Sequence, residues 1–262
     1  NEISGQERNV ATVGHHDNLQ ADLPFPKFAG IHTYGNQGRF WYNGLQAYVE
    51  RRFSNGLSYT FSYAFSKSMD ENVGEGEFDA LLAYSPAWYN RHRSANDFRH
   101  IQAATVVWEL PYGHGRRFGA DSNFVLNAIL GGWQASVYET ARSGQPLTIG
   151  NSNGNLGNGQ SSRADIIGNP NVANPSDKGW FNPAAFAPAP LYTFGNANVG
   201  DVNGPGYFNA DTALSKRAYL SEARYLEFRW EAFNALNRTN LYNPVQNVND
   251  SNLGKIFGSN AA

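Results

Sequence analysis

Apolar and polar side chains alternate with a period of two along several stretches of the chain. In the clearest stretch, 57–67, the large side chains all share one face: Leu57, Tyr59, Phe61, Tyr63 and Phe65. Small side chains hold the alternate positions, mostly serine and threonine. Strict alternation predicts a β-strand with one apolar face. About ten such residues, tilted by about 45°, cross the roughly 25 Å apolar band of a bilayer.

The same pattern predicts five more strands. The stretch 42–53 alternates and is followed by Ser54-Asn55-Gly56, a typical tight-turn sequence, because Asn and Gly accept positive φ. A hairpin of 42–53 and 57–67 is therefore expected. The remaining predicted strands are 99–110, 131–142, 207–218 and 224–236. One charged residue, Glu139, interrupts an apolar face.

The connections between these strands differ strongly in length. Short ones (54–56, 219–223 and a compact 111–130) alternate with long ones (68–98, 143–206 and 237 to the end). Residues 150–206 are rich in Gly, Asn and Pro and are predicted to be loop almost throughout. Loops of this length are unusual in a compact soluble domain. Outer-membrane barrels, by contrast, alternate short periplasmic turns with long extracellular loops.

Aromatic residues gather near both ends of the predicted strands. Trp108, Trp133 and Tyr225 lie near the short turns, whereas Trp41 and Phe233 lie toward the long loops. Two belts of amphipathic rings are typical of the two interfaces of a bilayer. The alternative is a soluble β-sandwich with aromatic residues in its core, whose outer face would then carry few protective charges.

Composition narrows the function classes. Charged residues make up 16% and aromatic residues 14% of the chain, and no apolar run approaches the roughly 20 residues of a spanning helix. The net charge of −2 and the lack of a basic stripe argue against a nucleic-acid partner. The absence of cysteine excludes disulfides and thiolate metal sites.

Several short motifs follow one another in a fixed order from about Pro24 onward. They are RRFSNGL (51–57), FSKS (65–68), DFRH (97–100), ELPYGHGRRF (109–118), LGGWQ (130–134), SGQP (143–146), WFN (180–182), AF (185–186), FGN (194–196), GPG (204–206) and EFRWEAFN (227–234). In this order they resemble the C-terminal part of the barrel of Oar-like TonB-dependent receptors. The resemblance implies an outer-membrane transporter of Gram-negative bacteria, with a barrel of about 22 strands that moves a bulky substrate and is energised through TonB.

The same resemblance implies that the chain is part of a longer protein. An N-terminal sandwich domain and a plug, which family members carry, would be missing from it, and one further strand would follow Ala262. Six strands cannot close a barrel of this class. The chain is therefore expected to be a partial barrel, 1–262, that does not transport by itself and aggregates outside detergent.

Two groups of side chains are candidates for functional contacts. Glu227, Arg229 and Glu231 alternate with apolar residues in 224–236, and Arg exposed to lipid at mid-depth costs about 2–4 kcal/mol. They are therefore predicted to face the lumen, as a structural ladder rather than a substrate site. Four of the aromatic residues in the longest loop would either contact a ligand or fold the loop back: Trp180, Phe181, Phe186 and Tyr192.

Enzymatic and metal-binding constellations are not expected. There is no phosphate loop of the form G-x-x-x-x-G-K-[ST] and no H-E-x-x-H motif. His15-His16 and the acidic residues between Asp70 and Asp79 are interpreted as hydrated loop residues, with calcium as the alternative for the acidic group. No catalytic residue, cofactor or metal is predicted.

The sequence thus predicts an all-β, antiparallel transmembrane barrel fragment in the cell outer membrane. Its partners would be outer-membrane lipid, the TonB complex through other parts of the protein, and a substrate that the sequence does not specify. The alternatives are a surface receptor or adhesin built on the same scaffold and, from a different class, a soluble carbohydrate-binding β-protein.

Overall fold

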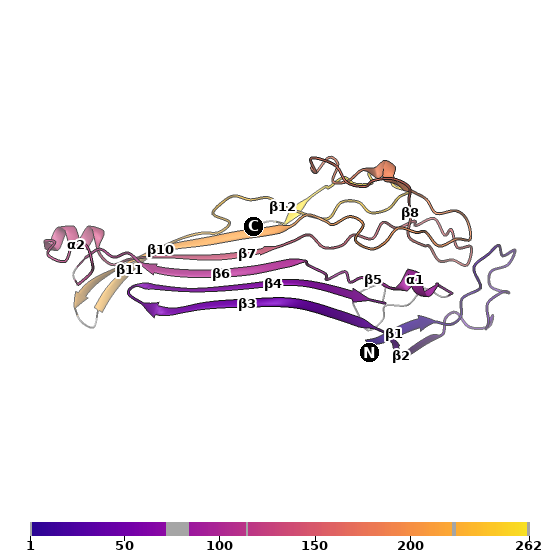
Figure 1. Cartoon of the computed structure of the whole chain (residues 1–262), viewed down its shortest axis with the longest axis horizontal. Helices are drawn as coiled ribbons and strands as arrows, with labels where there is room; N and C mark the ends of the chain where they lie inside the picture. Colours follow the sequence, from indigo (N-terminus) through magenta and orange to yellow (C-terminus); the bar gives the residue numbers. More distant parts are fainter. Residues whose placement is uncertain (1, 72–83, 114, 222–223, 261–262) are drawn as a thin grey trace.

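A single antiparallel sheet of long strands forms the main part of the molecule (Figure 1). The computed structural model describes residues 2–71, 84–113, 115–221 and 224–260. Short turns and helix α2 (Phe124–Leu130) lie at one end of the sheet, and the long connections gather at the other. We call these the short-turn end and the long-loop end.

Six long strands follow one another through the sheet in sequence order, from β3 at one edge to β11 at the other. They are β3 (Phe40–Ser54), β4 (Leu57–Asp70), β6 (His100–Glu109), β7 (Trp133–Arg142), β10 (Tyr207–Ser221) and β11 (Arg224–Ala232). All neighbours are antiparallel, and the short β5 (His92–Arg93) also pairs with β4. The predicted antiparallel β-sheet is confirmed.

Strand ends differ from the predicted ranges where the backbone turns. The stretch 131–142 begins as a strand only at Trp133, because Gly132 has φ +73°. The stretch 224–236 ends at Ala232, since Asn234 and Asn237 have φ values of 45° and 48°. At the predicted tight turn, Asn55 and Gly56 have φ values of 53° and 80°, the pair of positive φ values expected for a type I′ hairpin.

The strands are staggered along the sheet. By register, one line perpendicular to the strands passes through Leu57, Trp108, Ala135, Leu214 and Trp230. Strand β4 begins at this line. Strands β10 and β11 both extend beyond it, since β10 ends at Ser221 and β11 starts at Arg224. The turns at the short-turn end are therefore displaced along the strand direction from β4 to β11. Strands that tilt against the line of their turns are the geometry that barrel closure requires.

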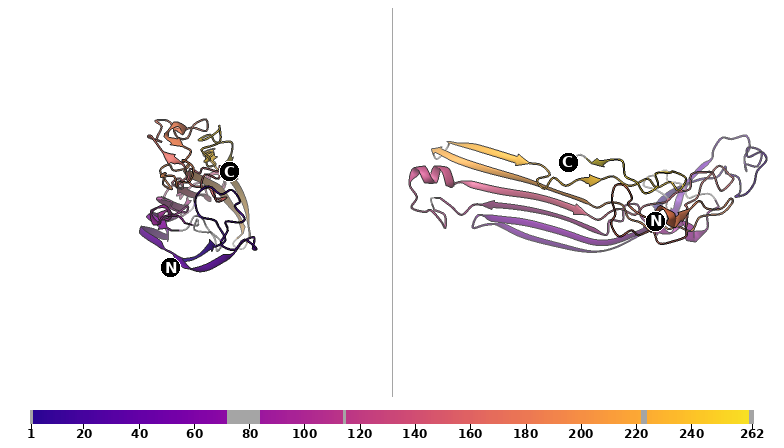
Figure 2. Two further views of the ribbon diagram at one scale, coloured as in Figure 1. Left: turned by 90° about the vertical axis from the view of Figure 1, so that its right-hand side faces the viewer. Right: turned by 90° about the horizontal axis from the view of Figure 1, so that it is seen from above.

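The sheet is curved and open. Seen along its strands, it forms an arc with loops gathered beside it (Figure 2, left). The outer edges of β3 and β11 pair with no other strand among the described residues.

Short elements occupy the connections. They are β1 (Glu2–Glu7), β2 (His32–Gly38), α1 (Ala87–Asn90), β8 (Asp165–Ile166), η1 (Pro183–Ala185), β9 (Phe186–Ala187), β12 (Asn240–Leu241) and β13 (Ser259–Asn260). The pairing of β1 with β2 was not predicted from the sequence. No described helix has the length and apolar character needed to cross a membrane.

The largest buried hydrophobic cluster lies in the long connections, not beneath the sheet. Its members are Leu147, Ile149, Ala164, Phe181, Ala185, Phe186, Ala197, Val202 and Leu253. We call residues 143–206 and 237–260 the loop body. Regular structure is sparse there, as predicted, but the segment has a packed core and is a folded unit.

Candidate functional site: two sheet faces and a loop body

Residues that pair directly across strands lie on the same face of a sheet, so the register defines two faces over all six strands. On one, the apolar face, most exposed side chains are large and apolar: Leu45, Val49, Phe61, Phe65, Trp108, Val137, Leu226, Phe228 and Trp230. An exposed apolar surface that extends over six strands is far larger than a soluble protein tolerates. It is suited to contact with lipid.

The opposite face, the polar face, carries hydroxyl, amide and charged side chains. Its members include Glu50, Ser58, Thr60, Ser62, Thr105, Glu109, Gln134, Ser136, Asn209, Asp211, Ser215, Arg217, Glu227, Arg229 and Glu231. Such side chains need water or polar partners. The two faces of one sheet therefore require two different surroundings.

The three charged residues singled out in the sequence lie together on β11. Arg217 Nε of β10 is 2.7 Å from Glu227 Oε2, and Arg229 Nη2 is 2.6 Å from Glu231 Oε1. Each charge thus has a partner of opposite sign on the same face. The four side chains form two ion pairs, and the lumen-facing role expected for Glu227, Arg229 and Glu231 stays a prediction.

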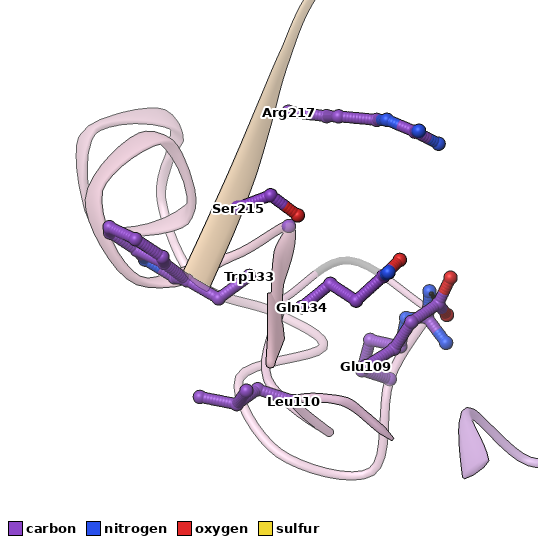
Figure 3. A pocket seen from close by; sticks show the side chains of 8 residues that line it. Glu109, Leu110, Trp133, Gln134, Ser215 and Arg217 are labelled. Atoms are coloured by element: carbon purple, nitrogen blue, oxygen red, sulfur yellow. Dashed lines mark hydrogen bonds and ion pairs between the residues drawn. The ribbon is translucent and has the colours of Figure 1, made fainter. Parts of the chain in front are cut away.

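The short-turn end of the polar face contains a small cavity of about 80 Å³ (Figure 3). Arg116 Nη2 donates to Glu109 Oε2 at 2.6 Å at its rim. Figure 3 shows Glu109, Gln134 and Arg217 on one side of the strands, with Trp133 on the other. The cavity therefore belongs to the polar face.

Several polar residues on the apolar face have polar partners. Gln102 Nε2 donates to Glu139 Oε1 at 2.9 Å across the β6–β7 pair, and Tyr63 Oη lies 2.7 Å from His100 Nδ1. Lys216 Nζ, near the short-turn end, reaches the carbonyl oxygen of Gly131. Hydrogen bonding reduces the cost of placing such groups on a lipid-facing surface.

The loop aromatics have different surroundings. Phe181 and Phe186 are 2% and 6% exposed and pack edge to face at 5.6 Å in the core of the loop body. Of the two roles considered, this burial favours folding of the loop over ligand contact. Trp180 is half-buried and donates through Nε1 to the Asn203 carbonyl at 2.7 Å. Tyr192 is exposed.

A buried arginine joins the loop body to α1. Arg163 lies 3.7 Å from the ring centroid of Tyr89 and donates to the carbonyl oxygens of Ala197 (2.7 Å) and Tyr89 (2.9 Å). The Arg163 backbone N–H donates to Tyr89 Oη at 2.7 Å. Burial raises the pKa of Tyr89, although the charge of Arg163 opposes it, so the phenol stays neutral at physiological pH. No pattern in the sequence indicates this contact.

The other sequence candidates do not assemble into a reactive site. His15 and His16 contact different carboxylates, those of Asp17 and Asp22. The acidic residues Glu75, Glu77 and Asp79 lie outside the described residues, within which no cluster of potential metal ligands is found. Residues 150–154, GNSNG, have the spacing G-x-S-x-G, but the strand-to-helix turn that a nucleophile elbow needs is absent at this described segment.

A tilted antiparallel meander with one apolar face, one ion-paired polar face and long connections gathered at one end defines an outer-membrane β-barrel protein. The chain belongs to the outer membrane beta barrel domain family, whose model matches residues 2–262. It is accordingly a protein of the cell outer membrane, in contact with membrane lipid, and its family is typically non-enzymatic. This assignment rules out the soluble alternative. No curated protein and no solved structure matches the chain.

Proposed function

We propose that the chain is the barrel portion of a TonB-dependent transporter similar to Oar-like receptors, which moves a bulky substrate across the outer membrane. The observation that carries this proposal is the polar face. Its ion pairs extend over β10 and β11, so the barrel interior must be filled with water or polar protein. A barrel of about 22 strands encloses such an interior, closed by a plug.

In this proposal the six strands are one arc of the barrel, and further strands pair with the outer edges of β3 and β11. An unpaired edge in hydrocarbon leaves backbone groups unsatisfied at several kcal/mol each. The apolar face points outward to lipid, and Glu227, Arg229 and Glu231 face the lumen, where the plug lies. The loop body is extracellular.

A second candidate is a surface receptor or adhesin on the same barrel. The folded loop body favours it, because a rigid extracellular unit with its own core can present a binding surface without transport. The two candidates differ in their need for TonB.

The test is genetic epistasis in the natural host, with the full-length protein. Strains that lack this gene, TonB or both are grown on a panel of polymeric and chelated nutrients. Transport predicts that each single deletion abolishes uptake of the same nutrient and that the double deletion adds nothing. Loss of attachment to surfaces, unchanged by TonB deletion, would instead establish the adhesin. A nutrient defect that appears only on gene deletion and not on TonB deletion would refute TonB-dependent transport.

A further inference from the structure

A small pocket lies where the polar face meets the loop body. Its volume is about 130 Å³, and its lining includes Phe98, Arg142, Gln145, Tyr207, Tyr242 and Asn243. Arg142 is the last residue of β7 and pairs directly with Tyr207, the first residue of β10. We call this cavity the Arg142 pocket. It sits on the route between the loops and the barrel interior in the proposed orientation.

Three of the ordered sequence motifs converge on this pocket. Phe98 belongs to 97–100, Gln145 to 143–146, and Pro205 and Gly206 to 204–206. The second and third motifs cross closely, because a Cβ on Gly144 would lie 1.7 Å from the Gly204 carbonyl oxygen. Only glycine at position 144 permits this crossing. These motifs, distant in sequence, together build one cavity.

Arg142 is exposed, and its guanidinium contacts two aromatic rings. Its guanidinium lies 4.4 Å from the Phe98 ring centroid and 5.7 Å from that of Tyr207. No hydrogen bond or ion pair joins the guanidinium to another described residue, and it is the one charged group in the lining. Arg217 and Arg229, by contrast, have carboxylate partners. The two rings fix the position of Arg142 without neutralising it.

We propose that the Arg142 pocket binds a carboxylate group of the ligand. A planar guanidinium presents paired N–H donors that match the two oxygens of a carboxylate, and such charge-assisted pairs are strong and directional. Aromatic rings and the amides of Gln145 and Asn243 surround the cation and complement the remainder of a polar ligand. Asn240 has a structural role, because its side chain hydrogen-bonds both backbone groups of Phe208.

A carboxylate-binding pocket names a substrate class for the proposed function. It rests on that function in one respect, namely that the bound ligand is also the transported substrate. Two sources would supply the carboxylate: an acidic sugar or the C-terminus of a peptide. Binding to purified full-length protein needs no TonB, so its failure can be told apart from failure of transport.

The experiment measures binding of two probes by isothermal titration calorimetry in detergent. One probe is trigalacturonate and the other is a tripeptide with a free C-terminal carboxylate; the neutral trisaccharide and the amidated tripeptide are their controls. At least one acidic probe should bind saturably, with its neutral counterpart at least about tenfold weaker. Binding of the sugar alone, the peptide alone or both identifies the source.

The variant series separates the pocket from general charge effects. Arg142→Gln should weaken binding by about 10- to 100-fold, since a charged hydrogen-bonding partner is lost. Arg142→Lys should restore only part of the affinity, because it keeps the charge without the planar fork. The matched control is Arg238→Gln, because Arg238 lies over one ring, that of Phe208 at 5.6 Å, outside the pocket.

Three results would overturn the proposal. They are saturable binding of neither acidic probe, equal binding by the Arg142→Gln and Arg238→Gln variants, and equal binding of acidic and neutral probes. Heat-modifiable migration in gels shows whether each variant is folded before it is titrated. If Arg142→Gln does not fold, Arg142→Lys carries the test, and unchanged affinity in it would count against bidentate recognition.

Discussion

Phe181→Ala is expected to destabilise the loop body by about 3–5 kcal/mol, the usual cost of removing a large buried aromatic side chain. Phe181 is almost fully buried and packs against Phe186 in the cluster that contains Leu147 and Val202. Among the described residues this cluster is the hydrophobic core of the loop body, so the loop body depends on it for its stability. The substitution should unfold the loop body locally while the strands remain intact.

Hydrogen exchange of the full-length protein in detergent measures this effect. Two amides report on the core: Leu147 N–H, which donates to Val202, and Ala164 N–H, which donates to Ile149. Both should lose protection in Phe181→Ala, whereas amides of β4 and β6 should not. Phe257→Ala is the control, because Phe257 is 74% exposed and its loss should change little. Equal protection in the two variants would show that the cluster does not stabilise the loops.

Phe61→Arg is expected to destabilise the protein folded in a bilayer by about 2–4 kcal/mol. Phe61 lies on the apolar face of β4, between Val49 and Ala104 on the neighbouring strands. A guanidinium there must enter hydrocarbon or drag water and headgroups toward it. The measurement is the midpoint of urea-dependent folding of the full-length protein into lipid vesicles, followed by heat-modifiable migration.

The adjacent position gives a matched control. Ser62→Arg introduces the same side chain one residue further along β4, on the polar face. Ser62→Arg should shift the urea midpoint of folding much less than Phe61→Arg does, because its guanidinium lies in the polar interior and not in hydrocarbon. An equal loss for both variants, or a larger one for Ser62→Arg, would mean that the faces have been assigned the wrong way round.

The sheet was largely predictable from the sequence because its strands depend on local patterns. Alternation in 57–67 fixed both the strand and its face, and Ser54-Asn55-Gly56 fixed the turn. The ends were less accurate: Gly132 and Asn234 adopt positive φ, which alternation does not encode. The pairing of β1 with β2 was missed because EISGQE and HTYGNQG lack a clear apolar alternation.

The core of the loop body could not be predicted, because it depends on contacts between distant segments. Leu147 and Leu253 belong to one cluster although about a hundred residues separate them. No periodic pattern marks either position, and Gly- and Asn-rich composition indicates loop. The same composition gives no indication of the role of Arg163, because its partner on α1, Tyr89, precedes it by 74 residues.

The sequence indicates the surroundings of the two groups of candidate residues to different degrees. The charges of 224–236 could be found because alternation places them on one face, and the structure pairs them there. For the loop aromatics the sequence left two roles open, and burial of Phe181 and Phe186 favours the structural one. Arg142 was not singled out, because its contacts with the rings of Phe98 and Tyr207 join positions that are distant in sequence.

The assignment of the apolar face to lipid and the polar face to the lumen is tested most directly by site-directed spin labelling. Residues 1–262 contain no cysteine, so single cysteines at Phe61, Ser62, Phe228 and Arg229 are the only labelled positions within this part of the protein. In the full-length protein in lipid vesicles, labels at Phe61 and Phe228 should collide mainly with oxygen, which concentrates in hydrocarbon. Labels at Ser62 and Arg229 should collide mainly with a water-soluble nickel complex. The reverse pattern, or no alternation along β4 and β11, would contradict the account.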